Sequence, residues 1–239
     1  MIESIGEETF NFQDERFADI QMLRYRLPDF DSLTIRQKQL IYCLSEATLF
    51  GRDITFDQFG KYNLRIRKTL EAVYLNFNGD RLEHNFRALE EYLKHVWFAS
   101  GIYHHYACDK FSPLFSEDFF RNEVLAIDSK LLPLNDGESV TSLLNELCPV
   151  IFDPTILPKR VDKSDGKDIV RSSACNYYDG VYQHEVEEFY TKLKKDGPTN
   201  EAPSYGLNST LVKEGDSIRE DVWKIDGKYG AAIEKIVYW

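Results

Sequence analysis

The side chains best suited to binding or catalysis are concentrated in one stretch, residues 96–113, with the sequence VWFASGIYHHYACDKFSP. This stretch combines the adjacent histidines His104 and His105, several aromatic residues, and the charged pair Asp109 and Lys110. Neutral imidazoles donate and accept hydrogen bonds, and aromatic rings offer large rigid surfaces, so the stretch is a candidate binding loop on a rigid helical platform. The alternative is an aromatic loop that closes a helical core, and composition alone favours that alternative.

A second group of candidate residues begins with His184 and Glu185. They match the start of the H-E-x-x-H zinc motif, but the fifth position is Glu188, so the second histidine ligand is missing. A solvated helix face is the better interpretation of these charges. Residues 162–168, DKSDGKD, resemble a calcium loop, yet the glycine comes one position early and no glutamate closes the loop. The chain therefore shows no self-contained active site.

The charge of the chain limits its classes of partner. Among 239 residues there are 29 Lys and Arg and 40 Asp and Glu, which gives a net charge of −11. Without a basic stripe, we expect binding neither to nucleic acid nor to an anionic membrane surface. Hydrophobic residues make up 43% of the chain, which indicates a folded protein with a sizeable core.

The four cysteines, Cys43, Cys108, Cys148 and Cys175, include no C-x-x-C pair, so we expect isolated thiols. No apolar run is long enough to span a membrane, and the acidic amino terminus has no signal-peptide core. These features favour the cytoplasm, and the alternative is the periplasm if an export signal has been removed. The final residues are apolar and uncapped, so we expect the chain to be part of a longer protein, and the alternative is a natural terminus packed into the core.

The elements that position the candidate residues are predicted from hydrophobic periodicity. The first part of the chain is expected to contain four helices, at residues 14–27, 34–51, 62–77 and 83–100. Asp14 and Thr34 are the predicted caps of the first two helices, and Pro28 and Gly51 are their predicted ends. The polar stretch 51–63 is then a connection.

The fourth predicted helix leads directly into the histidine-containing stretch. Its inward-facing residues at helical spacing are Phe86, Leu89, Leu93, Val96 and Trp97. Gly101 lies where a left-handed residue would end the helix, so a loop of residues 101–111 begins there. If that loop lines a peptide-binding surface, His105 and Tyr106 should be at least partly exposed, while Trp97 is buried.

The second half is predicted to add a small antiparallel sheet to further helices, so the whole chain is expected to be α+β. The stretches 207–212 and 218–225 flank a glycine turn as a hairpin, and residues 169–181 lean towards strand. Further helices are predicted after Ser116, after Ser139, from about Tyr182 and from about Lys228. The polar stretch 158–168 is an expected mobile loop or boundary.

Several longer phrases are more specific than any short motif. FADIQMLRYRLPDF, QKQLIYCLSEATLFGRDITFDQ, KYNLRIRKTLEAVY, YLKHVWFASGIYHHYACDKF, CNYYDGV and GLNSTLVKEGDSIREDVWKIDGKY occur in this order. Over residues 17–239 they closely resemble the amino-terminal part of bacterial dipeptidyl peptidase III. Members of that family are zinc metallopeptidases with two lobes around a wide cleft. They release dipeptides from the free amino end of short peptides.

The resemblance also implies what this chain lacks. In the family, the zinc is bound through an H-E-x-x-G-H helix and a downstream Glu, and this chain contains neither. We therefore expect no catalytic residue and no metal ligand here, and zinc belongs to the full-length enzyme. The helical subdomain 1–115 and the α+β subdomain 116–239 would together form one truncated lobe. Its expected partners are short peptides and the remaining, zinc-binding lobe of the same polypeptide.

For the loop, the resemblance implies contacts with the peptide beyond the scissile bond. His105 and Tyr106 match the positions nearest the peptide. The full set of implied substrate-binding residues is His105, Tyr106, His104, Tyr103, Asp109 and Lys110. An edge of the small sheet could also pair with an extended peptide. The competing hypothesis is a stand-alone module that binds peptide or protein without catalysis.

Overall fold

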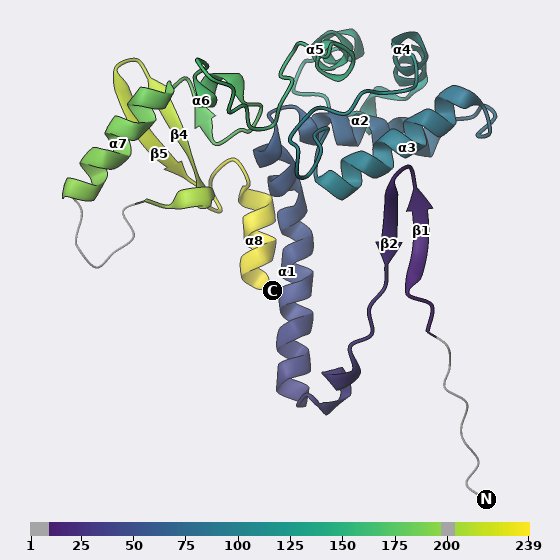
Figure 1. The fold of residues 1–239 in the computed structure, drawn as a ribbon, viewed down its shortest axis with the longest axis horizontal. Helices are drawn as coiled ribbons and strands as arrows, with labels where there is room; N and C mark the ends of the chain where they lie inside the picture. Colours follow the sequence, from purple (N-terminus) through teal and green to yellow (C-terminus); the bar gives the residue numbers. More distant parts are fainter. Residues whose placement is uncertain (1–9, 197–203) are drawn as a thin grey trace, which may run out of the picture. The chain divides into compact units, whose positions relative to one another are not determined.

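The computed structural model describes residues 10–196 and 204–239. Within these ranges, eight α-helices and two small sheets give the predicted α+β fold, with a mostly helical first half (Figure 1). No helix of the described ranges is long and apolar enough to cross a membrane. The chain divides into two compact units, Met1–Cys43 and Leu44–Trp239, and the boundary falls within helix α1, Ile35–Phe59.

The first unit contains a β-hairpin where a helix was predicted over residues 14–27, so that prediction is wrong. Strands β1, Gln13–Phe17, and β2, Ile20–Leu23, pair antiparallel. Ala18 has φ 46° in the turn between them. Both strands are almost entirely exposed. A strand with no buried face does not need the alternation of apolar and polar residues by which a strand is identified in a sequence.

Helix α1 is longer than predicted. Thr34 and Gln37 form a capping box at its start, because each side chain accepts a hydrogen bond from the backbone amide of the other, at 3.3 and 2.9 Å. The predicted end at Gly51 and the predicted connection over 51–63 are wrong, since the helix continues through the glycine to its last residue, Phe59. Burial of Ile54 and Phe56 in this stretch outweighs the low helix propensity of glycine.

Helices α2, Asn63–Asn76, and α3, His84–Ala99, begin and end close to the predicted residues and pack against each other (Figure 1). Their fully buried residues include Ile66, Thr69, Leu70, Val73, Phe86, Leu89, Leu93 and Val96. Trp97 was predicted to be buried, but it is 40% exposed, and its indole N–H donates to Glu71 at 2.7 Å. Leu93 and Val96 fill the core positions of the last turns, so Trp97 lies at the edge of that face, where its polar atom keeps a partner.

Helices α4, Glu117–Ala126, and α5, Val140–Phe152, begin at the predicted caps. The hydroxyls of Ser116 and Ser139 each accept a hydrogen bond from the backbone amide three residues later. One hydrophobic core contains buried residues from Phe56 to Ala174 and therefore includes residues on both sides of the predicted division at 115/116. That division stays a prediction.

The remaining elements of the second unit are α6 (Ile169–Ser172), β3 (Tyr178–Asp179), α7 (Gln183–Asp196), β4 (Ser209–Glu214), β5 (Ser217–Val222) and α8 (Gly230–Tyr238). The hairpin β4–β5 is antiparallel as predicted, and β3 adds to β4 in parallel, so the sheet is mixed. A second, smaller core of Val181, Val186 and Leu211 joins α7 to this sheet. Residues 169–181 are strand only at β3, because α6 forms a helical turn capped by Asp168.

Candidate functional site: the aromatic-histidine loop

The loop Gly101–Phe111 begins where α3 ends. The left-handed residue at this end is Ser100, with φ 56°, one position before the predicted Gly101. Gly101 itself has φ 153°, and a Cβ at this position would collide with the side chain of Asn63. The glycine is therefore needed for close packing of the loop against the start of α2.

Backbone hydrogen bonds close the loop on itself. The amide of His104 donates to the Asp109 carbonyl at 2.8 Å, and the amide of Cys108 donates to the His104 carbonyl at 3.0 Å. The Nδ1 atom of His104 accepts from the amides of Tyr106 and Ala107, at 3.2 and 3.0 Å. The imidazole of His104 thus organises the tip, and in its neutral form Nε2 carries the proton and can donate to a ligand.

Four rings form what we call the aromatic surface: Phe98, His104, His105 and Tyr106. The His105 ring centroid lies 4.5 Å from that of His104, 4.3 Å from that of Tyr106 and 5.1 Å from that of Phe98. Tyr106 is 85% exposed, as predicted, and His105 is half-buried. Three of the six predicted binding residues are therefore gathered at one exposed place.

Lys110, also predicted to bind substrate, points into the protein. Its ammonium donates to the carbonyl oxygens of Val150, Asp153 and Ile156, at 2.9, 2.5 and 2.6 Å. Partial burial lowers the pKa of Lys110, and the nearby Asp153 opposes this shift. All three ammonium protons have acceptors, so Lys110 fastens the loop to the carboxyl end of α5.

Tyr103 and Asp109 complete the predicted set. Tyr103 is only 2% exposed, its hydroxyl donates to the Leu157 carbonyl at 3.0 Å, and burial raises its pKa well above the usual range. The carboxylate of Asp109 is exposed and lies 3.2 Å from the ammonium of Lys159. In this structure Tyr103 is a packing residue, and Asp109 forms a surface ion pair.

Arg160 supports the loop from outside it, and sequence reasoning does not identify this residue. Its guanidinium donates to the His105 carbonyl at 3.1 Å, lies 3.6 Å from the Cys108 sulfur and stacks over the Phe59 ring at 4.6 Å. Arg160 also lines a largely apolar pocket of about 410 Å³, together with Phe59, Cys175 and Tyr177. A single arginine in a polar stretch gives no sequence signal, because such residues usually face water.

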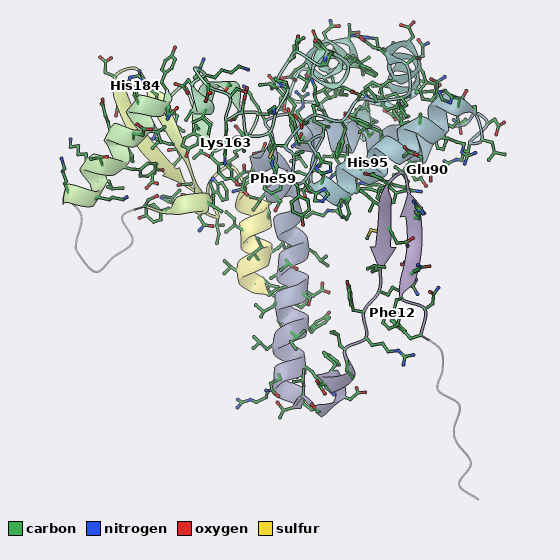
Figure 2. The ribbon with its side chains drawn as sticks, viewed as in Figure 1. Phe12, Phe59, Glu90, His95, Lys163 and His184 are labelled. Atoms are coloured by element: carbon green, nitrogen blue, oxygen red, sulfur yellow. The ribbon has the colours of Figure 1, made fainter. Side chains whose placement is uncertain are left out.

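His184, the other histidine of interest, does not join this site. Figure 2 shows His184 on α7, well separated from His95 on α3, the helix that leads into the loop. The neighbouring Glu185 accepts a hydrogen bond from Lys213 at 2.5 Å, which holds the pKa of Glu185 below its usual range. Glu185 and Lys213 thus form a partly buried ion pair that joins α7 to β4.

In the part of the chain that the structure describes, neither metal-ligand geometry nor the buried thiol of Cys148 indicates a second site. Within residues 10–196 and 204–239, no three His, Cys, Asp or Glu side chains are grouped so that they could hold a metal ion, and these residues do not fit a zinc centre. The four cysteines are free thiols, and burial raises the pKa of Cys148 to about 11. A raised pKa disfavours the reactive thiolate.

Comparison with models of known protein families and with curated proteins gives no match to this chain. The likeness to dipeptidyl peptidase III therefore depends on the sequence phrases given above. The geometry of the aromatic surface is an independent basis for a functional proposal.

Proposed function

We propose that this chain is the amino-terminal, substrate-side part of a zinc-dependent peptidase of the dipeptidyl peptidase III type. In this proposal it binds short peptides and has no peptidase activity alone. The observation that carries the proposal is the braced presentation of Tyr106, which is 85% exposed on a loop held by Lys110 and Arg160. A ring held exposed on a braced loop is available to a ligand that would cover it.

The chemistry of the aromatic surface suits a peptide. The Nε2 edge of His104 offers a hydrogen bond to a peptide carbonyl, and the rings of His105 and Tyr106 offer faces for side chains. Because the loop is already ordered, binding costs little conformational entropy. The apolar pocket beside Arg160 is large enough for an apolar side chain of the same peptide.

In the full-length enzyme, the zinc would be held by the other lobe of the polypeptide, and this chain would supply no ligand to it. The acidic net charge of −11 favours the approach of a free peptide amino terminus. Strand β5, Ser217–Val222, lies at an edge of the three-stranded sheet and would allow an extended peptide to pair with it. The proposed compartment is the cytoplasm, with the periplasm as the alternative.

The test is calorimetric titration with an unmodified pentapeptide of alternating apolar and basic residues. Tyr106→Ala should weaken binding about tenfold or more, since exposed aromatic anchors carry much of the energy of such contacts. The matched control is Tyr205→Ala, because Tyr205 is also exposed, at 60%, and does not belong to the aromatic surface. Unchanged affinity in Tyr106→Ala, or equal loss in both variants, would contradict the proposal.

The alternative, a complete binding module without catalysis, predicts the same titration. The two hypotheses differ in what the gene must encode, because only the peptidase proposal requires an in-frame H-E-x-x-G-H motif downstream of Trp239. Sequencing the reading frame beyond that residue separates the two hypotheses.

A further inference from the structure

A second pocket of the Leu44–Trp239 unit, with a volume of about 560 Å³, has no role in the function proposed above. It is lined by the end of α1, the start of α2, helix α6 and strand β3, and no residue of the loop 101–111 lines it. Seven charged residues line this pocket. The four basic ones are Lys61, Arg65, Arg171 and Lys228, and the three acidic ones are Asp57, Glu146 and Asp179.

Two of the four basic residues are satisfied within the protein. Arg65 donates to the carboxylates of Glu138 and Glu146. The ammonium of Lys228 lies 2.7 Å from the carboxylate of Asp57. These pairs leave little positive charge at Arg65 or Lys228 for a ligand.

Lys61 and Arg171 are different, because neither lies within ion-pair distance of a carboxylate in the part of the chain that the structure describes. Each instead stands near an aromatic ring: Lys61 lies 5.8 Å from the ring of Tyr62, and Arg171 lies 5.2 Å from the ring of Tyr182. A ring supports a cation but does not neutralise it. Among the charged lining residues, the two cations Lys61 and Arg171 and the one carboxylate Asp179 have no ion pair in the described part of the chain, so the unpaired lining charge is positive by one in a chain whose net charge is −11.

We propose that this pocket, to whose lining Lys61 and Arg171 contribute unpaired positive charge, binds a small oxyanion, a carboxylate or phosphate group. The planar guanidinium of Arg171 offers two parallel N–H donors to such a group, and the ammonium of Lys61 adds a compact charge. The volume falls within the range of small-molecule sites. The source of the anion is either free phosphate or the carboxyl terminus of a short peptide.

Calorimetric titrations at low salt test the proposal with three probes. They are inorganic phosphate, an amino-acetylated tetrapeptide with a free carboxyl terminus, and the same peptide amidated at that terminus. The wild-type chain should bind phosphate, the free-acid peptide, or both, and should bind the amide less tightly than the acid. Preference for phosphate assigns the site to free phosphate, and preference for the acid over both other probes assigns it to a peptide terminus.

Lys61→Gln and Arg171→Gln should each weaken binding of the preferred anion about tenfold, because each removes a charge-assisted contact. Both residues are exposed, so the melting temperature should not change. The control is Lys163→Gln, which removes one positive charge from an exposed residue that does not line the pocket. Lys163 is labelled in Figure 2. Tyr106→Ala should leave phosphate binding intact, which separates this proposal from the peptide-binding one.

Two results would overturn the inference. The first is that wild-type chain binds neither phosphate nor the free-acid peptide, or binds acid and amide equally without binding phosphate. The second is that Lys163→Gln weakens anion binding as much as Arg171→Gln, which would mean that only the general charge of the surface matters.

Discussion

Replacing Lys110 with methionine tests whether the loop is braced as described. The methionine keeps the apolar stem of the side chain and removes the ammonium that donates to the Val150, Asp153 and Ile156 carbonyls. Those carbonyls lie at or just beyond the carboxyl end of α5, so the change removes both their donor and a positive charge at the negative end of the helix.

The magnitude follows from the number of contacts and from their exposure. Hydrogen bonds to a charged group contribute about 1.5–3 kcal/mol each, and a charge at a helix end contributes about 0.3–1 kcal/mol. The three bonds share one ammonium that is only partly buried, so their contributions do not add fully and water replaces some of them. We expect Lys110→Met to lower the free energy of unfolding by about 2–4 kcal/mol.

The assay is urea unfolding monitored by circular dichroism. The dependence of the unfolding free energy on urea concentration should be the same in all variants. The control is Lys159→Met, which breaks an exposed ion pair with Asp109 and should cost less than about 1 kcal/mol. Lys110→Arg should fall between the two, because a planar fork cannot meet three convergent carbonyls as well as an ammonium does. A Lys110→Met variant as stable as Lys159→Met would show that the three contacts do not brace the loop.

Four further outcomes are expected. Trp97→Ala should cost about 1–2 kcal/mol in urea unfolding, less than the roughly 2–5 kcal/mol for the fully buried Leu93→Ala, because much of the Trp97 ring is exposed. Tyr106→Ala should change the free energy of unfolding by no more than about 0.5 kcal/mol. A loss as large as that of Leu93→Ala would show that the loop is part of the hydrophobic core. The purified chain, with or without added zinc, should not hydrolyse an arginyl-arginyl chromogenic substrate faster than buffer does. Lys167 holds the pKa of Asp162 far below its usual range. The ionised carboxylate therefore stabilises the fold at pH values above its pKa in the unfolded chain, about 3.9. This stabilisation is lost as the pH falls below that value. Acid titration of Asp162→Asn should therefore show a weaker loss of stability than wild type.

The elements that sequence reasoning located correctly carry strong local signals. Helices α4 and α5 start at the capping residues Ser116 and Ser139, and α2 and α3 show helical spacing of buried residues over several turns. Helix α1 continues past Gly51 because distant segments bury Ile54 and Phe56, and no local pattern reports that packing. The exposed hairpin β1–β2 has no buried face, so the two-residue alternation of apolar and polar side chains is not visible in its sequence.

The same distinction applies to the loop. The candidate binding residues lie within one short stretch of the sequence, and the peptide-binding hypothesis predicts the exposed Tyr106 that the structure shows, whereas composition alone favours core packing. The roles of Lys110 and Arg160 depend on partners about 40 to 100 positions away along the chain, such as Val150 and Phe59, so they follow only from the folded structure.

Except for His104, whose imidazole both organises the tip and offers Nε2 to a ligand, the residues that hold the loop differ from those that it presents. Tyr103, Lys110 and Arg160 use their polar atoms inside the protein, while the ring of Tyr106 is exposed. Position 106, whose side chain is 85% exposed, is therefore open to diversification, and a library randomised at this site should fold in most of its members. Ligand preference at this surface can thus evolve by single substitutions without passing through unfolded intermediates.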